Sequence, residues 1–296
     1  MNVKAYKKIF LLSIILISLG IFLYYYTYPL DTCEDISKKI LKGQNSSLRI
    51  ITLNIHHGKG EASFFMLPFS SRKSVMDRLS RIAALIKEEQ PDIIVFQEVD
   101  NASIFSGNTD HLQILQNLTG YTYSYYGNHA SIAGGLLSGS SGIGILSKYP
   151  FTNAESFAFP TSFPTPTKGY ISVSVNVQQN NFSIISPHLT WIDFLHGGTK
   201  HKQIMRIAQQ GVDTDLIILG DFNQEWNTGN ALQFLVENMS LKAFEPESNE
   251  LFTYRRPCER VDWILISSDL TFTQYYHIHN KESDHAAVVA DIKIKP

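Results

Sequence analysis

Apolar residues in this chain gather in short blocks that differ in their spacing. Two continuous apolar runs, within residues 92–99 (DIIVFQEV) and 216–219 (LIIL), predict strands that are buried on both faces. A clean alternation in residues 170–177 (YISVSVNV) predicts a half-buried strand, and the polar turn after it indicates a hairpin with residues 181–189. Further strands are expected at residues 49–55, 143–147, 261–267, 270–278 and 286–294.

Apolar residues at helical spacing predict helices between these strands. One helix covers residues 74–90 and ends before Pro91, a second covers residues 109–120, and a third covers residues 199–210. Antiparallel hairpins combined with crossover helices are typical of two sheets packed face to face with helices outside. We therefore expect an α/β sandwich.

The N-terminal segment differs from the rest of the chain. Residues 9–26 carry no charge and follow Lys4, Lys7 and Lys8. Such a run is at the short end of what crosses a bilayer as a helix, for which about 20 residues are needed. Because no small-x-small cleavage site follows it, we favour an uncleaved signal anchor over a cleaved signal peptide.

This segment sets the expected organisation of the chain. We expect a transmembrane anchor at residues 1–30, a polar linker at residues 31–47 and one domain at residues 48–296. Lysines before the anchor favour a cytoplasmic N-terminus. The large domain would then lie on the outer side of the membrane, whether periplasmic, extracellular or lumenal.

Net charge bears on the class of substrate. The whole chain has a formal charge of −2, but residues 31–296 have 22 basic and 27 acidic residues, a charge of −5. Proteins that bind nucleic acid through many phosphate contacts are usually basic, so this balance speaks against such a substrate. The two cysteines, Cys33 and Cys258, either pair in an exported domain or remain separate thiols, and no CxxC spacing indicates zinc.

Polar residues at the ends of apolar strands are the candidates for chemistry. Each has an ordinary structural role when taken alone; Asp221 and Asn223, for example, follow Gly220 as turn residues commonly do. Together they supply oxygen ligands, imidazoles and carboxylates that could orient those imidazoles, and oxygen ligands without cysteine favour Mg²⁺ or Mn²⁺. These are the parts needed for metal-assisted hydrolysis of a phosphoester. The full set is Asn54, Gln97, Glu98, His188, Asp221, Asn223, Asp262, Ser283, Asp284 and His285.

The motifs that contain these residues follow one another in a recognisable order. They read TLNIHHG, FQEV, SPHL, GDFN, RVDWILIS and SDHAAV. This series resembles the endonuclease/exonuclease/phosphatase superfamily, also called DNase-I-like, over roughly residues 48–294. The resemblance implies a four-layer α/β sandwich with two mostly antiparallel sheets face to face and helices outside.

The resemblance also implies a metal site. Glu98 is the expected ligand of Mg²⁺, with Mn²⁺ as the other candidate, and Asn54 assists it from the first strand. Asp284 is a further ligand candidate. His56 and His57 stand where some members carry an acidic residue two positions after the asparagine, so one metal and two metals both remain open.

The same resemblance implies roles for five catalytic residues. His285 activates or holds the attacking water, and Asp262 orients it. Asp221 and Asn223 position the nucleophile and the phosphate, and His188 stabilises the transition state or assists the leaving group. Whether Asp221 or His285 is the base stays open.

Arginines before Asp262 are weaker candidates. Arg255, Arg256 or Arg260 could hold a second phosphate, and a solvated loop accounts for this stretch equally well.

We therefore expect a membrane-anchored, Mg²⁺-dependent phosphoester hydrolase, with a phosphodiesterase acting on a lipid head group as the leading hypothesis. The aromatic stretches at residues 64–69 and 191–195 could contact lipid or pack in the protein. The alternatives are a metal-dependent nuclease and a non-catalytic binding module on the same fold. No protein partner is evident from the sequence.

Overall fold

The computed structural model describes residues 47–61, 69–132, 138–160, 165–191, 198–211, 215–227, 230–255 and 258–293. Within these ranges no helix is both long and apolar enough to cross a membrane. The expected anchor at residues 1–30, nearly all of the expected linker, and Cys33 lie outside the described residues. The anchor and the domain boundaries therefore stay predictions.

The first sheet has the strand order β14-β15-β1-β2-β5-β4, with the short β3 paired to β2. Its central pair, β1 and β2, is parallel, and the other pairs are antiparallel. The strands are β1 (Ser47–Asn54), β2 (Ile93–Ser103), β3 (Thr109–Asp110), β4 (Tyr123–Ile132), β5 (Gly139–Ser147), β14 (Thr271–Ile278) and β15 (Ala287–Lys293).

The second sheet repeats this plan with the order β10-β13-β9-β8-β7-β6. Here β8 and β9 are the parallel pair, and the remaining pairs are antiparallel. The strands are β6 (Phe151–Ala158), β7 (Gly169–Val177), β8 (Asn180–His188), β9 (Asp215–Asp221), β10 (Leu241–Ala243) and β13 (Asp262–Ser267), and a separate small ladder joins β11 (Tyr254–Arg255) to β12 (Cys258–Glu259).

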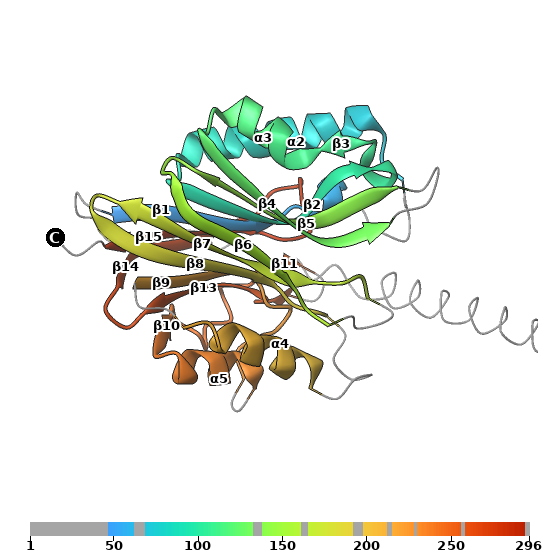
Figure 1. The fold of residues 1–296 in the computed structure, drawn as a ribbon. Helices are drawn as coiled ribbons and strands as arrows, with labels where there is room; N and C mark the ends of the chain where they lie inside the picture. Colours follow the sequence, from blue (N-terminus) through green and yellow to red (C-terminus); the bar gives the residue numbers. More distant parts are fainter. Residues whose placement is uncertain are drawn as a thin grey trace, which may run out of the picture.

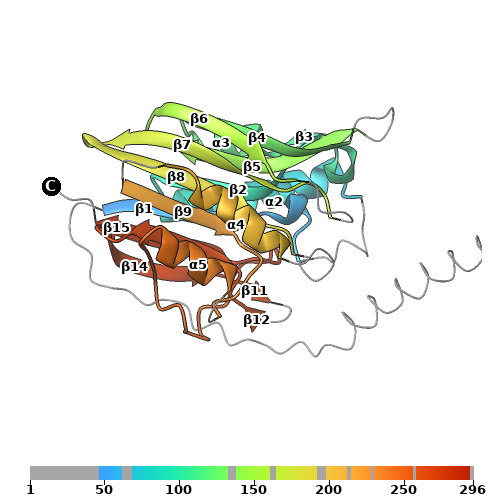
Figure 2. The ribbon, with the colours of Figure 1, turned by 60° about the horizontal axis from the view of Figure 1, so that its bottom comes forward.

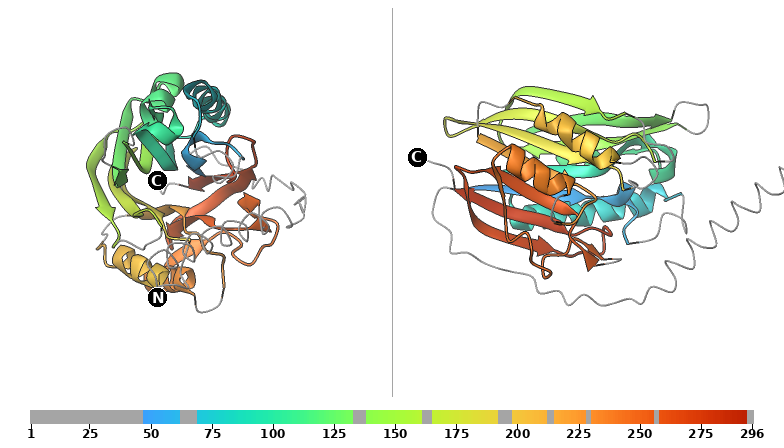
Figure 3. Two further views of the ribbon diagram at one scale, coloured as in Figure 1. Left: turned by 90° about the vertical axis from the view of Figure 1, so that its right-hand side faces the viewer. Right: turned by 90° about the horizontal axis from the view of Figure 1, so that it is seen from below.

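Helices cover the outer face of each sheet, which gives four layers (Figure 1). Helices α2 (Arg72–Glu89) and α3 (His111–Thr119) lie on the first sheet. Helices α4 (Thr199–Ala208) and α5 (Ala231–Asn238) lie across the second sheet, as the turned views show (Figures 2 and 3). The expected four-layer α/β sandwich is confirmed.

The buried strands explain why the layers stay together. On β9, Ile217 and Leu219 enter the core between the two sheets, whereas Leu216 and Ile218 enter the core under α4 and α5. Successive side chains of a strand point to opposite faces, so a continuous apolar run can serve two cores at once. The LIIL run is therefore buried on both faces, as expected.

Most predicted elements are present, and their ends agree to within a few residues. The α2 helix starts after Ser71, whose side chain accepts a hydrogen bond from the Ser74 amide at 3.2 Å, and ends at Glu89, with Gln90 as its C-cap before Pro91. The pattern missed β4, β6 and α5, and also the short strands β3, β10, β11 and β12. The β6 strand lies at the edge of its sheet and is largely exposed, so it lacks a clean apolar alternation, and α5 has only eight residues.

Strand pairing brings the candidate chemistry to one end of the sandwich. Asn54 ends β1, and His188 and Asp221 end the parallel strands β8 and β9. In the ladder, Asp221 lies opposite His188 on one side and opposite Asp262 on the other. Strand register thus places His188, Asp221 and Asp262 side by side, although they are far apart in the sequence.

Candidate active site

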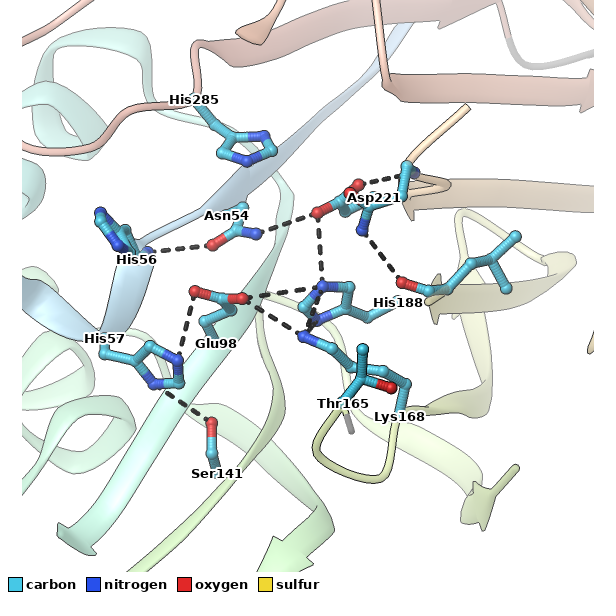
Figure 4. Close-up of polar contacts among 12 residues, drawn as sticks. Asn54, His56, His57, Glu98, Ser141, Thr165, Lys168, His188, Asp221 and His285 are labelled. Atoms are coloured by element: carbon cyan, nitrogen blue, oxygen red, sulfur yellow. Dashed lines mark hydrogen bonds and ion pairs between the residues drawn. The ribbon is translucent and has the colours of Figure 1, made fainter. Parts of the chain in front are cut away.

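Asp221 is the centre of the polar group at this end of the sandwich (Figure 4). Its Oδ2 accepts a hydrogen bond from the Asn54 amide at 3.0 Å and lies 3.4 Å from His188 Nε2. Its Oδ1 accepts a hydrogen bond from the backbone N–H of Asn223 at 2.8 Å. The structure therefore brings Asn54, His188 and Asn223 together around one carboxylate.

His285 and Asp262 form a second part of the same group. His285 Nδ1 lies 2.8 Å from Asp262 Oδ2, and both residues are buried. Ser283 fixes the loop, because its hydroxyl donates to the Asn54 carbonyl at 2.6 Å and accepts from the His285 amide at 3.1 Å. One ligand atom from each of Asp221, Asp262 and His285 lies within 4.8 Å of the others.

Glu98 enters the site from an irregularity in β2. The register between β2 and β5 shifts between Gln97 and Val99, and Glu98 has a φ of 56°. A bulge of this kind re-aims a side chain. Glu98 thereby faces three basic groups, with its Oε1 3.3 Å from Lys168 Nζ and 3.8 Å from His188 Nε2, and its Oε2 3.3 Å from His57 Nε2.

The structure also places the remaining predicted residues. The Asn223 side-chain amide donates to the Leu189 carbonyl at 3.0 Å, so it helps to set the loop as well as facing the group. Asp284 Oδ1 lies 3.3 Å from His56 Nδ1 and does not contact Glu98 among the interactions of the described residues.

Of the three candidate arginines, Arg255 and Arg260 are described, and both form contacts outside the polar group. Arg255 forms an ion pair with Glu61. The buried Arg260 donates to the carbonyl groups of Glu245 and Phe244 and to the Tyr275 hydroxyl, and it stacks over Trp263, with its guanidinium carbon 3.9 Å from the ring centroid. The structure does not bring Arg260 into the polar group, because its guanidinium serves packing beside the second sheet. Arg256 lies outside the described residues.

Cys258 is disulfide-bonded and is not a free thiol. Its only candidate partner within the chain, Cys33, lies outside the described residues.

Burial and neighbouring charges shift the pKa values of the ionisable groups in the site, and they shift them in different directions. Burial raises the pKa of Glu98, but the charges of His57 and Lys168 outweigh it and hold the pKa well below its ordinary value. Burial, followed by the charge of Asp262, raises the pKa of Asp221 to about 7. Burial lowers the pKa of His285, yet Asp262 outweighs it and raises the pKa well above its ordinary value. For His188, burial and then Lys168 lower the pKa far below its ordinary value.

This arrangement fits a divalent cation. Glu98 stays ionised, and its carboxylate is a hard oxygen ligand of the kind that Mg²⁺ and Mn²⁺ prefer. Asp262 Oδ1 is buried and has no hydrogen-bond partner among the described residues, so this carboxylate oxygen could accept a further contact. The donor set contains oxygen and imidazole nitrogen and no cysteine, which agrees with the kind of metal expected.

Lys168, His57 and Asp100 belong to the site, but no role was predicted for them from the sequence. Lys168 contacts Glu98, and its Nζ lies 2.9 Å from His188 Nε2, while His57 Nδ1 lies 2.7 Å from Asp100 Oδ1. A usable signal for Lys168 was its place directly before the apolar alternation of β7. A pocket of about 230 Å³ opens beside these groups, lined also by Phe105.

Comparison with known proteins agrees with the geometry. Residues 51–285 match the model of the Endonuclease/Exonuclease/phosphatase family. No curated protein sequence matches the chain.

Solved structures with the same fold include an endonuclease/exonuclease/phosphatase from Beutenbergia cavernae DSM 12333, 18% identical with a TM-score of 0.67 over 84% of this chain and 72% of that one. The human nocturnin catalytic domain with bound sulfate is 18% identical, with a TM-score of 0.63 over 87% of this chain and 97% of that one. D. rerio TDP2 in complex with a single-strand DNA product is 17% identical, with a TM-score of 0.60 over 84% of this chain and all of that one.

Identities this low show the fold alone, whereas the family match spans most of the described sandwich and every motif from the first strand to His285. Members of this family are typically hydrolases of phosphoester bonds and generally depend on divalent metal ions. The chain belongs to the endonuclease/exonuclease/phosphatase family.

Proposed function

We propose that this protein is a Mg²⁺-dependent phosphodiesterase, anchored to a membrane, that cleaves a lipid head group or a similar phosphodiester. The observation that carries the proposal is the buried group of Asp221, Asp262 and His285, linked through His188 to Glu98. Hydrolysis of a phosphodiester requires a carboxyl group with a pKa near 7, an oriented imidazole and an ionised metal ligand.

Asp221 is the better candidate for the base. Its pKa of about 7 suits a group that accepts a proton from water near neutral pH. His285 keeps its proton because its pKa is raised, so it would bind a phosphate oxygen as an imidazolium. Asp262 holds the ring through Nδ1, which leaves Nε2 to face the substrate.

Glu98 and Asn54 would hold the cation. When bound, the cation would polarise a phosphoryl oxygen and stabilise the leaving oxyanion. Lys168 supplies a further positive charge between Glu98 and His188, where it can bind a phosphate oxygen. His188 stays neutral, so in this proposal it orients Lys168 and Asp221 by hydrogen bonding.

Two features support a lipid-linked substrate over nucleic acid. Residues 31–296 have a net charge of −5, which would repel a polyanion. Trp191, three residues after His188, is 62% exposed, and Phe69 is 52% exposed. An exposed aromatic ring three residues from His188 would suit contact with a bilayer that also holds the apolar residues 9–26.

A nuclease is the second candidate, favoured by the likeness to TDP2 in complex with a single-strand DNA product. The test supplies Mg²⁺ to the full chain, either reconstituted into glycerophospholipid vesicles or kept in detergent with supercoiled plasmid, with His285→Gln as the control. We expect release of phosphorylated head group from the vesicles, no nicking, and neither activity in the variant. Nicking by the native chain that is lost in His285→Gln, without release from vesicles, would overturn the lipid proposal in favour of a nuclease.

A further inference from the structure

The Glu98 carboxylate is held from two opposite sides. Lys168 and His188 contact Oε1, and His57 alone among the described residues contacts Oε2, with 3.3 Å between His57 Nε2 and that oxygen. Glu98 also has a φ of 56°, so its backbone occupies a conformation that is uncommon for its residue type. A side chain re-aimed in this way needs fixed partners if it is to keep one orientation.

His57 is itself fixed at both its ring and its backbone. Its Nδ1 lies 2.7 Å from Oδ1 of Asp100, which is buried, and the Asp100 amide donates to His111 Nδ1 at 3.2 Å. The His57 backbone has a φ of 52°, and Gly58 follows with a φ of 66°. A Cβ on Gly58 would lie 3.0 Å from a methyl of Val75, so the turn is packed closely against α2.

Both ring nitrogens of His57 therefore contact carboxylates. Asp100 takes Nδ1 and Glu98 takes Nε2, which leaves no ring nitrogen for a substrate (Figure 4 shows the Glu98 side). Glu98 and Asp100 lie two residues apart on β2, so one strand supplies both ends of this chain of contacts. Residues that hold a metal-binding carboxylate in place commonly decide how tightly the metal binds.

We propose that His57, oriented by Asp100, is a positioning residue that holds Glu98 in the orientation in which it binds the divalent cation. The inference rests on the proposed metal-dependent function and adds to it a role for His57. It assigns His57 to Glu98 and not to the substrate.

Two substitutions separate the two contacts of the ring. In His57→Asn the amide reaches about as far as Nδ1, so it can keep Asp100 and lose Glu98. In His57→Gln the amide reaches about as far as Nε2, so it can keep Glu98 and lose Asp100. Asparagine and glutamine can both adopt the positive φ of residue 57. Asparagine tolerates positive φ in general, and Gln90, Gln178 and Gln179 have positive φ in this chain.

The experiment measures Mn²⁺ affinity of the full chain in detergent by electron paramagnetic resonance, with no substrate present. We expect His57→Asn to weaken Mn²⁺ binding about 10- to 100-fold, as is usual for partners of metal ligands, and His57→Gln to weaken it much less. His129→Gln is the matched control, because His129 lines the same pocket but contacts the Ser156 hydroxyl at 3.1 Å instead of a carboxylate. Its Mn²⁺ affinity should equal that of the native chain.

Glu98→Gln distinguishes failure of this inference from failure of the proposed function. If Glu98→Gln binds Mn²⁺ as the native chain does, the metal is not held at Glu98 and both proposals fall. If Glu98→Gln weakens binding but His57→Asn does not, the inference alone is overturned. Equal weakening in His57→Asn and His57→Gln, with a matching loss of thermal stability, would also overturn it, because the role would then be structural.

Discussion

Oδ2 of Asp221 accepts a hydrogen bond from the side-chain amide of Asn54 at 3.0 Å, and this bond joins the end of β1 in one sheet to the end of β9 in the other. Both side chains are buried. The bond therefore links the two sheets at the place where the polar group is built, and the amide donor helps Asp221 to carry charge without water.

Asn54→Asp should destabilise the protein at alkaline pH. The substitution keeps the shape, replaces the donor by an acceptor and sets a second carboxylate against Asp221. We expect a loss of about 1–3 kcal/mol in the free energy of unfolding at pH 8, from one buried acceptor left without its donor, and a smaller loss at pH 4, where a protonated carboxyl can donate. Asn181→Asp is the control, since the Asn181 side chain accepts a hydrogen bond from Asn176 at an exposed position where β7 pairs with β8. Equal losses in the two variants would contradict a special role for the Asn54 donor.

Asp221→Asn should change how stability depends on pH in the metal-free protein. The native pKa of about 7 exceeds the ordinary 3.8, so between these values the folded protein binds a proton that the unfolded chain has released. The contribution of Asp221 to stability is therefore fully present below about pH 4 and lost as the pH rises through 7.

The asparagine at 221 does not titrate, so the difference from the native chain should grow between pH 4 and pH 8. We expect the variant to gain on the order of 4 kcal/mol relative to the native chain over this range, at about 1.4 kcal/mol per pKa unit. Chemical denaturation in EDTA at several pH values measures the difference. A difference that stays constant with pH would show that Asp221 titrates normally.

Lys168→Met should lower activity, and it should also lower stability, because it leaves the largely buried Glu98 carboxylate without one of its charged partners. The substitution keeps the aliphatic part of the side chain and removes the charge between Glu98 and His188, which we expect to cost about 10²-fold in kcat, as the loss of one charge-stabilising donor commonly does. Lys148→Met is the matched control, because Lys148 pairs with Asp92 on the surface. If both variants keep native kcat, Lys168 has no part in catalysis.

Gly220→Ala should disturb both the fold and the site. A Cβ at Gly220 would lie 2.3 Å from the Pro187 carbonyl oxygen on β8, so the two strands that carry Asp221 and His188 must move apart. We expect a lower Tm together with a loss of turnover. Gly211→Ala is the control, because its Cβ would meet nothing within 4 Å. An unchanged Tm for Gly220→Ala would mean that the strands are not held at this spacing.

Much of the fold could be predicted because its strands are strongly apolar. The runs around Ile94 and Ile218 each serve two cores, and a short continuous apolar run is typical of a strand that is covered on both faces. Edge elements such as β6 were missed because exposed strands lose the pattern that burial imposes.

The site could be predicted in part for a different reason. Asp221, Asp262 and His285 follow or precede apolar strands inside short motifs, so their positions are visible in one dimension. Lys168 and Asp100 are not visible in this way, because their roles depend on which side chain lies across a sheet or a bulge. Arg260 was a candidate because it lies near a motif in the sequence. In the structure its guanidinium lies over the Trp263 ring instead of facing the site.

The most direct test is hydrolysis of bis-p-nitrophenyl phosphate by the full chain, measured in EDTA, after addition of Mg²⁺, and in the variants His285→Gln and His129→Gln. We predict no turnover in EDTA, turnover with Mg²⁺, its loss by about 10²- to 10⁴-fold in His285→Gln, and its retention in His129→Gln. Turnover that persists in EDTA, or that survives in folded His285→Gln, would contradict a metal-dependent hydrolase centred on this group.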